Sequence, residues 1–236
     1  MQPRTLLSTL LSLLSLPSLH LSRVFVGLVL STAVSCSMAH EKPPEATDPS
    51  RLGTLSEGHG LPVGTKAPNA EVLNEKNRPV ALHDVLGHHP ALLVFYRGGW
   101  CPPCNFQIHE LASHAAEFQQ RGISIVAVSV DKPDHASETT NEYKITFPVL
   151  SDPALVAHNA YHVVDHIGSF SNFMIGRMGV DLEERSGLTH HDVAVPAMFL
   201  VDESGVIRWS HADVDYNKRP RLTDILAAID KSGLVK

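Results

Sequence analysis

The sequence predicts an α/β fold in which a central mixed β-sheet is flanked by helices on both faces. Residues 91–96 (ALLVFY) and 123–130 (ISIVAVSV) are continuous apolar runs, as expected of buried central strands. Each run is followed by a segment of helical character, which is the order of a parallel crossover unit. Residues 193–201 and 206–210 are also strand-like, and the turn residues 202–205 (DESG) join them as an antiparallel hairpin. Parallel strands and a hairpin in one domain give a mixed sheet.

The other elements follow from local spacing. A helix is expected after residue 104 because apolar side chains recur there at helical spacing, and Gly122 ends it. Pro133 stands near the start of a polar helix over 132–143. Short strands are expected at 71–73, 80–82 and 147–150, and further helices at 153–161 and 222–229.

Two features of the second half interrupt this order. Residues 162–192 fit the alternating pattern poorly, and we interpret them as an insertion, partly helical, that precedes the next strand. Pro196 falls inside the strand-like run 193–201. Since proline has no N–H to give to a sheet, its position predicts an edge, a bulge or a cis peptide bond.

The first 39 residues read as a leader. Arg23 precedes the apolar run 24–34 (VFVGLVLSTAV), a Leu/Ser-rich stretch lies upstream at 6–16, and no acidic residue occurs before Glu41. Neither run reaches the roughly 18–20 residues of a membrane-spanning helix, so we expect an export signal. The protein is then exported, either free in the periplasm or anchored so that it faces the periplasm or the outside. Contact with a membrane is expected only through the leader or a lipid anchor.

Two ways of processing this leader stay open. The tripeptide 37–39 (SMA) suits cleavage after Ala39, whereas residues 33–36 (AVSC) resemble a bacterial lipobox and make Cys36 a candidate for lipidation. Residues 40–60 are polar and rich in proline and glycine, so we expect a flexible linker there. The folded domain is expected over 61–236.

The composition narrows the class of protein. Of the 236 residues, 43% are hydrophobic, which is ordinary for a folded domain, and the formal net charge is −6. No dense run of Lys or Arg occurs, which argues against nucleic acid as a partner. No glycine-rich loop follows a strand, so a nucleotide is not indicated. We expect neither a metal nor an organic cofactor.

Chemistry is expected at Cys101 and Cys104, which form a Cys-Pro-Pro-Cys motif between a buried strand and a helix. The start of a helix carries partial positive charge, which lowers the pKa of a thiol and makes it a better nucleophile. Arg97 adds charge nearby, and Trp100 is expected to shape the site. A zinc site would need more ligands, and Asn105 stands where haem attachment would need His. The motif therefore favours thiol redox chemistry over a structural role.

The residues around this motif carry a family resemblance. Residues 95–105 (FYRGGWCPPCN), 195–202 (VPAMFLVD) and 205–208 (GVIR), together with 63–68 (VGTKAP) and 213–216 (DVDY), resemble the peroxiredoxin-like branch of the alkyl hydroperoxide reductase/thiol-specific antioxidant (AhpC/TSA) family. The resemblance covers about residues 61–232. It implies a thioredoxin-like fold and thiol-dependent redox activity.

The resemblance nominates two different nucleophiles. Typical peroxiredoxins carry Pro-x-x-x-Thr/Ser-x-x-Cys, and that motif places Cys104 at the attacking cysteine, Cys101 at the Thr or Ser, and Arg97 at the proline. Their activating arginine would align with Pro196. Thioredoxins, by contrast, attack with the first cysteine of the pair, here Cys101, and place a cis proline against the sulfurs, which Pro196 would supply.

The function expected from this resemblance is thiol-dependent peroxidase activity. A hydroperoxide oxidises one sulfur, the other forms a disulfide with it, and a thioredoxin-like dithiol reduces the pair. The alternative enzyme is a thioredoxin-like oxidoreductase that takes protein disulfides as substrates.

The second alternative is a His-rich metal-binding protein without catalytic activity. There are 15 histidines, and His158, His162 and His166 stand four residues apart, with His190 and His191 farther on. On one helix face the first three would be candidate ligands for a transition metal. Histidine is also an ordinary polar residue at surfaces, and that interpretation is the stronger one.

Overall fold

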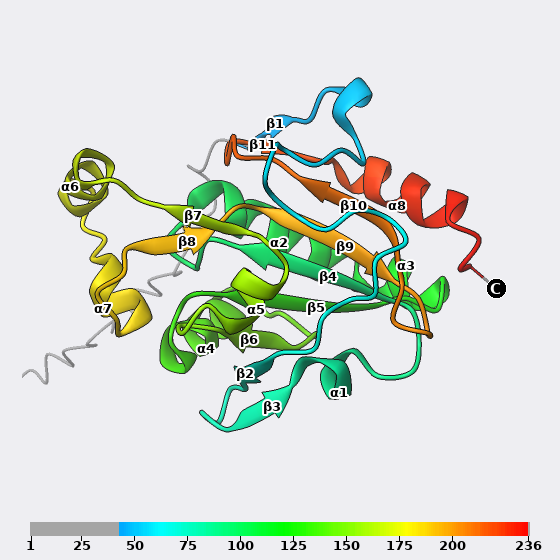
Figure 1. The fold of residues 1–236 in the computed structure, drawn as a ribbon, viewed down its shortest axis with the longest axis horizontal. Helices are drawn as coiled ribbons and strands as arrows, with labels where there is room; N and C mark the ends of the chain where they lie inside the picture. The colour runs from blue at the N-terminus through cyan, green and yellow to red at the C-terminus, as the bar shows by residue number, and fades with distance from the viewer. Residues whose placement is uncertain (1–42, 236) are drawn as a thin grey trace, which may run out of the picture. The chain divides into compact units, whose positions relative to one another are not determined.

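The computed structural model describes residues 43–235. The leader and Cys36 lie outside the described residues. Seven strands form the main sheet, in the spatial order β10-β9-β4-β5-β6-β2-β3. They are β2 (Glu71–Leu73), β3 (Pro79–Ala81), β4 (Ala91–Tyr96), β5 (Ser124–Ser129), β6 (Val149–Ser151), β9 (Ala197–Val201) and β10 (Ile207–Ala212). The pairs β4–β5 and β5–β6 are parallel and the others are antiparallel, so the predicted mixed sheet is confirmed (Figure 1).

Helices cover both faces of this sheet, as predicted. The helices are α1 (Leu82–Leu86), α2 (Pro102–Ser113), α3 (Ala115–Gln120), α4 (Pro133–Glu142), α5 (Val156–Ala160), α6 (Ser169–Arg177), α7 (Leu182–Ser186) and α8 (Leu222–Lys231). The central strand β4 shows why both faces are covered. All six of its residues are buried, and successive side chains of a strand point to opposite faces.

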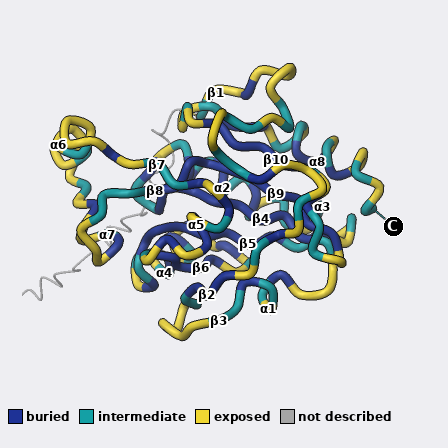
Figure 2. Tube along the Cα trace, in the orientation of Figure 1, coloured by how far each residue is buried: buried dark blue, intermediate teal, exposed yellow. Residues whose placement is uncertain are grey.

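Two hydrophobic cores result. On one face, Leu92 and Val94 pack with side chains of α2, α3, α4 and α8. On the other face, Leu93 and Phe95 pack with side chains of α1 and α5. Figure 2 shows the central strands of this sheet, β4, β5 and β9, as largely buried. The two cysteines belong to the first core, where α2 lies against the sheet.

Residues 164–194 form an arm that leaves the main sheet. The strands β7 (Val164–His166) and β8 (Asp192–Ala194) pair antiparallel in a sheet of their own, and α6 and α7 lie between them in the chain. Figure 1 shows these two helices at the outer end of the arm. The region expected as a partly helical insertion therefore contains two helices and strand β7, which the sequence pattern does not predict, whereas β8 begins the predicted strand-like run 193–201.

The segment before the domain also differs from the linker expected at 40–60. Strand β1 (Glu45–Ala46) pairs in parallel with β11 (Lys218–Arg219), and a short 3-10 helix, η2, spans Pro49–Arg51. Leu55 then forms a bridge with Ala212 at the end of β10. Polar composition suggested a free tether, but backbone hydrogen bonds do not depend on apolar side chains.

Pro196 corrects another expectation. It lies between β8 and β9 rather than inside one strand, so the absence of its N–H removes no sheet hydrogen bond. No peptide bond between residues 43 and 235 is cis, so the predicted cis proline is wrong. Within the same range, no helix is both long enough and apolar enough to cross a membrane.

Candidate active site

The two cysteines lie where strand β4 gives way to helix α2. Cys101 is the N-cap residue of α2 and Cys104 lies in its first turn, where the N–H of Cys104 donates to the carbonyl oxygen of Cys101 at 3.0 Å. The preceding Gly98 has a φ of +141°, a conformation that side chains rarely allow. A side chain on Gly99 would collide with the hydroxyl of Thr139. The Gly-Gly pair thus permits the tight loop that brings both cysteines to the helix start.

The structure contains both cysteines as free thiols, and each is 1% exposed. Cys104 sits among groups that stabilise a negative charge. The Arg219 guanidinium donates through Nη2 to Cys104 Sγ at 3.4 Å. Burial by itself would raise the pKa of Cys104. The hydrogen bond from the Cys101 thiol, the charge of Arg219, and the backbone N–H and charge of Arg97 outweigh burial and lower that pKa to about 6. Cys104 is therefore largely a thiolate at neutral pH.

Cys101 has the opposite character. Burial raises the pKa of Cys101 well above its usual range, and the hydrogen bond to Cys104 and the negative charge there raise it further. The charges of Arg97 and Arg219 oppose this shift without reversing it. In the reduced pair, Cys101 is thus a thiol that donates its S–H to the Cys104 thiolate. This polarity is the reverse of the one that the thioredoxin analogy implies, in which the first cysteine attacks.

Arg219 is the residue that sequence reasoning missed. The alignment with typical peroxiredoxins leaves Pro196 in place of the activating arginine, and the structure supplies a cation from β11 instead. Its side chain is 4% exposed, although arginine is seldom buried without a partner. The DVDY motif at residues 213–216 stands only three residues away, but no spacing rule marks Arg219 itself.

Arg97 and Trp100 line the cleft together with Cys101. The Arg97 guanidinium is 5.0 Å from the ring centre of Trp100 and 4.2 Å from that of Tyr216, so it is held between two aromatic rings. Arg97 is 6% exposed. This stacking holds the charge of Arg97 close to both sulfurs. It also gives a role to Tyr216, a residue of the DVDY motif for which the sequence offered none.

A buried carboxylate anchors the loop that carries Cys101. Asp131 follows β5, and its Oδ2 accepts the Gly99 N–H at 2.7 Å. The same carboxylate accepts two hydrogen bonds from Arg185 of α7, at 3.1 and 3.0 Å. Asn105 completes the anchor by donating its side-chain amide to the Gly99 carbonyl oxygen at 2.7 Å. Asp131 follows the carboxyl end of a predicted strand, and the neighbouring strand leads to the cysteines. This position is the feature of the sequence that could have identified Asp131 as part of the site.

A cleft of about 460 Å³ opens next to Cys101. One wall is formed by Arg97, Trp100, Pro102 and Tyr216, and the other by residues of the arm. The arm contributes mainly apolar side chains: Ile167, Phe170, Met174, Ile175, Met178 and Val180. Several of these are unusually exposed for their size; Phe170 is 77% and Met178 is 75% exposed. Cys104 does not line the cleft.

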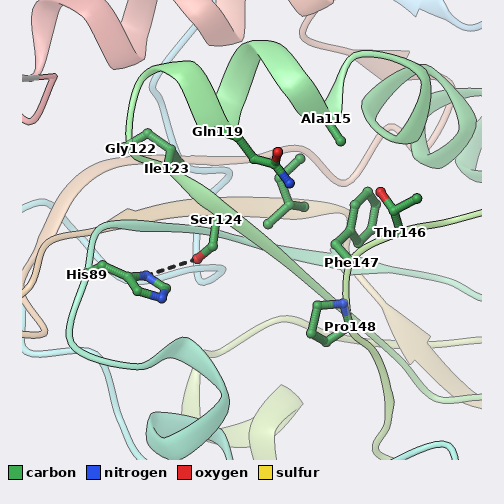
Figure 3. Close-up of a pocket in the computed structure, with 10 residues that line it drawn as sticks. His89, Ala115, Gln119, Gly122, Ile123, Ser124, Thr146, Phe147 and Pro148 are labelled. Carbon is green, nitrogen blue, oxygen red and sulfur yellow. Dashed lines mark hydrogen bonds between the residues drawn. The ribbon is translucent and has the colours of Figure 1, made fainter.

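A second cavity, of about 380 Å³, lies elsewhere, between α3, β5 and the loop before β6 (Figure 3). Its lining includes His89, Gln119 and Phe147, and Ser124 Oγ lies 3.3 Å from His89 Nδ1. Neither cysteine borders it. It has no part in the thiol site.

The histidine cluster of the metal-binding alternative does not assemble. His158 lies on α5 and is fully buried, with its Nδ1 2.7 Å from Asp152 Oδ2. His166 lies on β7 and is paired with Asp192 instead. The helix face assumed for His158, His162 and His166 is therefore absent. Within residues 43–235, no three His, Cys, Asp or Glu side chains are grouped to hold a metal ion.

Comparison with known proteins gives one family. The AhpC/TSA family profile matches residues 63–210, well over half of the chain. The chain is 28% identical over 113 residues to a 1-Cys peroxiredoxin of Hordeum vulgare, covering 45% of this chain and 51% of that protein. It thus spans about half the length of the curated relatives it matches.

Solved structures agree on the fold. A peroxidoxin of Mycobacterium tuberculosis superposes with a TM-score of 0.56 at 16% identity, covering 74% of this chain and 97% of that one. A yeast mitochondrial 1-Cys peroxiredoxin, described with a thiol-resolving mechanism through glutathione/thioredoxin systems, gives a TM-score of 0.53 at 18% identity. That match covers 72% of this chain and 75% of the yeast chain. The predicted thioredoxin-like fold is confirmed.

Proposed function

The chain belongs to the AhpC/TSA family, and we infer that it is a thiol-dependent peroxidase that reduces hydroperoxides with Cys104 and Cys101. One observation carries this proposal: the buried sulfur of Cys104 accepts a hydrogen bond from Arg219, and this contact and the hydrogen bond from the Cys101 thiol both lower the pKa of Cys104. A thiolate is the form of cysteine that attacks peroxides. The disulfide between the two cysteines is part of the proposal.

In the first step, the Cys104 thiolate attacks the terminal oxygen of the hydroperoxide. A sulfur–oxygen bond forms and the oxygen–oxygen bond breaks. Cys104 becomes a sulfenic acid, and the departing alkoxide or hydroxide takes a proton and leaves as an alcohol or water. Arg219 and Arg97 are the cations close enough to stabilise the charge that develops on the leaving oxygen.

In the second step, Cys101 attacks the sulfenic sulfur of Cys104. A disulfide forms, and the proton of Cys101 leaves with the hydroxyl group as water. The negative charge of Cys104 is one cause of the high pKa of Cys101, and oxidation removes that charge. The first step therefore makes Cys101 easier to deprotonate just when its thiolate is needed.

The third step requires an external dithiol that reduces the Cys101–Cys104 disulfide by exchange. A thioredoxin-like protein is the proposed reductant. The support is indirect: the yeast relative is described as acting through glutathione/thioredoxin systems. Cys101 borders the cleft, so it is the sulfur that a bulky reductant reaches first.

The cleft bears on the oxidant. An apolar wall next to Cys101 fits an organic hydroperoxide with a hydrophobic tail as well as hydrogen peroxide. We keep export as a separate proposal, based on the apolar run at 24–34 and on the absence of acidic residues before Glu41. Lipidation of Cys36 and cleavage after Ala39 are its two forms.

The test of the proposed function is steady-state turnover. The reduced protein is supplied with thioredoxin, thioredoxin reductase and NADPH, and NADPH oxidation is followed with hydrogen peroxide and with cumene hydroperoxide. We expect turnover by the wild type and none above background by Cys104→Ser or Cys101→Ser, because each variant lacks one half of the disulfide. If both variants turn over like the wild type, the proposed function is wrong. If no form turns over peroxide but the wild type reduces insulin disulfides, the protein is a disulfide oxidoreductase.

A further inference from the structure

The segment over residues 45–56, called here the N-terminal segment, lies along β10 and β11 rather than apart from the domain. Its strand β1 pairs with β11 in the register Ala46 opposite Arg219. The Glu45 N–H donates to the carbonyl oxygen of Asn217 at 2.9 Å, and the Thr47 N–H donates to that of Arg219 at 2.8 Å. Among the described strands, β11 pairs only with β1. The backbone of Arg219 is thus held in a two-stranded sheet by its pairing with the N-terminal segment.

The same segment also holds the turn that leads into β11. Arg51 Nη1 lies 3.6 Å from Asp213 Oδ2, and the Asp213 side chain is only 3% exposed. The Ala212 N–H donates to the Thr54 carbonyl oxygen at 3.0 Å, and the Ser56 N–H donates to the Ala212 carbonyl oxygen at 2.9 Å. Both ends of the stretch from the end of β10 to β11 are therefore fixed by the N-terminal segment.

The side chain of Arg219 is tied closely to its own strand. Its Nη1 donates to the neighbouring Lys218 carbonyl oxygen at 2.8 Å, and its Nη2 donates to Cys104 Sγ at 3.4 Å. The guanidinium is therefore aimed by the β11 backbone. Because hydrogen bonds weaken steeply with distance and angle, a shift of β11 would weaken the contact with Cys104.

We propose that the N-terminal segment is a positioning element of the active site, which holds Arg219 against Cys104 and so keeps the sulfur in its reactive form. Thr47 is its key residue, because its N–H anchors the carbonyl group of Arg219 itself. This proposal rests on the proposed role of Cys104 as the attacking thiolate.

The other groups that face Cys104 lie on elements other than β11, and one of them, Arg97, stacks on Tyr216 in the stretch before β11. They are the Cys101 thiol, the Tyr96 hydroxyl and the cation of Arg97. Of the charged and titratable groups around the sulfur, only Arg219 lies on a strand that pairs with β1. If the segment merely covered the edge of the fold, its loss would lower stability and leave the ionisation of Cys104 unchanged.

Thr47→Pro in the full chain distinguishes a segment that positions Arg219 from one that only covers the edge of the fold. Proline has no N–H to donate to the carbonyl oxygen of Arg219. Ala46→Pro is the matched control. Successive N–H groups of a strand point to opposite sides, so that of Ala46 points away from β11. The readout is the rate at which iodoacetamide alkylates Cys104, measured against pH by site-resolved mass spectrometry. This rate follows the thiolate and needs no peroxidase activity, so it separates failure of this proposal from failure of the proposed function.

We expect Thr47→Pro to raise the midpoint of the Cys104 profile by about one pH unit, and so to lower alkylation about threefold at pH 6.5. Ala46→Pro should leave the midpoint within about 0.2 unit of the wild type. An unchanged midpoint in folded Thr47→Pro, or an equal shift in both variants, overturns the proposal. If Thr47→Pro does not fold, Arg51→Met takes its place, with an expected rise of about half a unit, and an unchanged midpoint there has the same meaning.

Discussion

Cys101 and Cys104 are one helical turn apart, yet the two sides of the pair differ in almost every property. The side of Cys104 is closed and charged, with a buried arginine from β11 against the sulfur. The side of Cys101 opens to a cleft whose far wall is the apolar and exposed helix α6. Cys104 therefore lies beside the charge that stabilises a thiolate, and Cys101 lies at the cleft.

This difference indicates how the work is divided. In the proposed mechanism, the cleft beside Cys101 is the side from which an oxidant approaches, and the charged side carries out the first step. A larger protein reductant needs to reach only Cys101. The two sides are joined by Asp131, which holds the cysteine loop at Gly99 and the arm at Arg185.

The largest expected effect comes from Asp131→Asn, which removes the carboxylate that links Gly99 of the cysteine loop to Arg185 of the arm. The change leaves the Arg185 cation without its buried carboxylate partner and should lower the free energy of unfolding by about 2 kcal/mol. Urea denaturation followed by circular dichroism measures it. Glu138→Gln is the control, since Glu138 also pairs with Arg185 but its side chain is 64% exposed. Equal free energies of unfolding in the two variants would mean that the Asp131–Arg185 pair does not stabilise the fold.

The next largest effect is expected from Arg219→Ala on the closed side. Loss of the cation raises the pKa of Cys104 from about 6. A rise of about two units lowers the thiolate fraction, and with it the rate of peroxide oxidation at pH 7, about tenfold. Stopped-flow oxidation at pH 7 and pH 9 tests this, because at pH 9 most of the thiolate and of the rate should return.

Lys218→Ala controls for the loss of a neighbouring positive charge, because Lys218 pairs with Asp215 at the surface. Its rate should equal that of the wild type at both values of pH. A loss in Arg219→Ala that persists unchanged at pH 9 would contradict the electrostatic explanation.

The wild type should show the same electrostatics in its own pH dependence. The pKa of Cys104 is lowered to about 6, below that of a free thiol, so the thiolate is present above pH 6 and is lost as the pH falls through that value. The oxidation rate should therefore be flat from pH 7 to 8 and fall about fourfold at pH 5.5. A rate that rises steadily up to pH 9 would assign the reaction to a thiol of ordinary or raised pKa, such as Cys101.

The smallest effect is expected on the open side. Phe170→Ser removes an aromatic ring from the cleft and should slow oxidation by cumene hydroperoxide about threefold, with no change for hydrogen peroxide. Phe173→Ser is the control, because Phe173 lies on the same helix and is 60% exposed but does not line the cleft. The measurement is the ratio of the two oxidation rates when cumene hydroperoxide and hydrogen peroxide compete for the same protein. If this ratio is the same in the two variants, the apolar wall does not select the oxidant.

The two sides also differ in how far the sequence predicted them. The buried strands 91–96 and 123–130, the hairpin after Val193 and the cysteine pair at the start of a helix follow from hydrophobic patterns and short motifs, which act locally. Arg97 and Trp100 lie beside the cysteines in the chain and were found in the same way. The contact between Arg219 and Cys104 joins residues 115 positions apart, and no local pattern encodes it.

The remaining errors have the same physical origin. Residues 45–56 are polar and were expected to be free, yet their backbone groups pair with β10 and β11, an interaction that composition does not report. Pro196 was expected inside a strand, at an edge, at a bulge or with a cis peptide bond, but the chain divides that run into β8 and β9 and leaves a trans proline between them. The polarity of the cysteine pair depends on the charges of Arg97 and Arg219, from two separate segments, which no alignment with thioredoxin can supply.

The central claim is that Cys104 is the sulfur that reacts first. The most direct measurement is a single-turnover reaction of reduced protein with hydrogen peroxide at pH 7, quenched in milliseconds and mapped by mass spectrometry in Cys101→Ser and Cys104→Ser. We predict that Cys101→Ser gains oxygen at Cys104 far faster than a free thiol would at the same thiolate fraction, and that Cys104→Ser does not react beyond that rate. Rapid oxidation of Cys101 in Cys104→Ser, with a slow reaction in Cys101→Ser, would contradict the account.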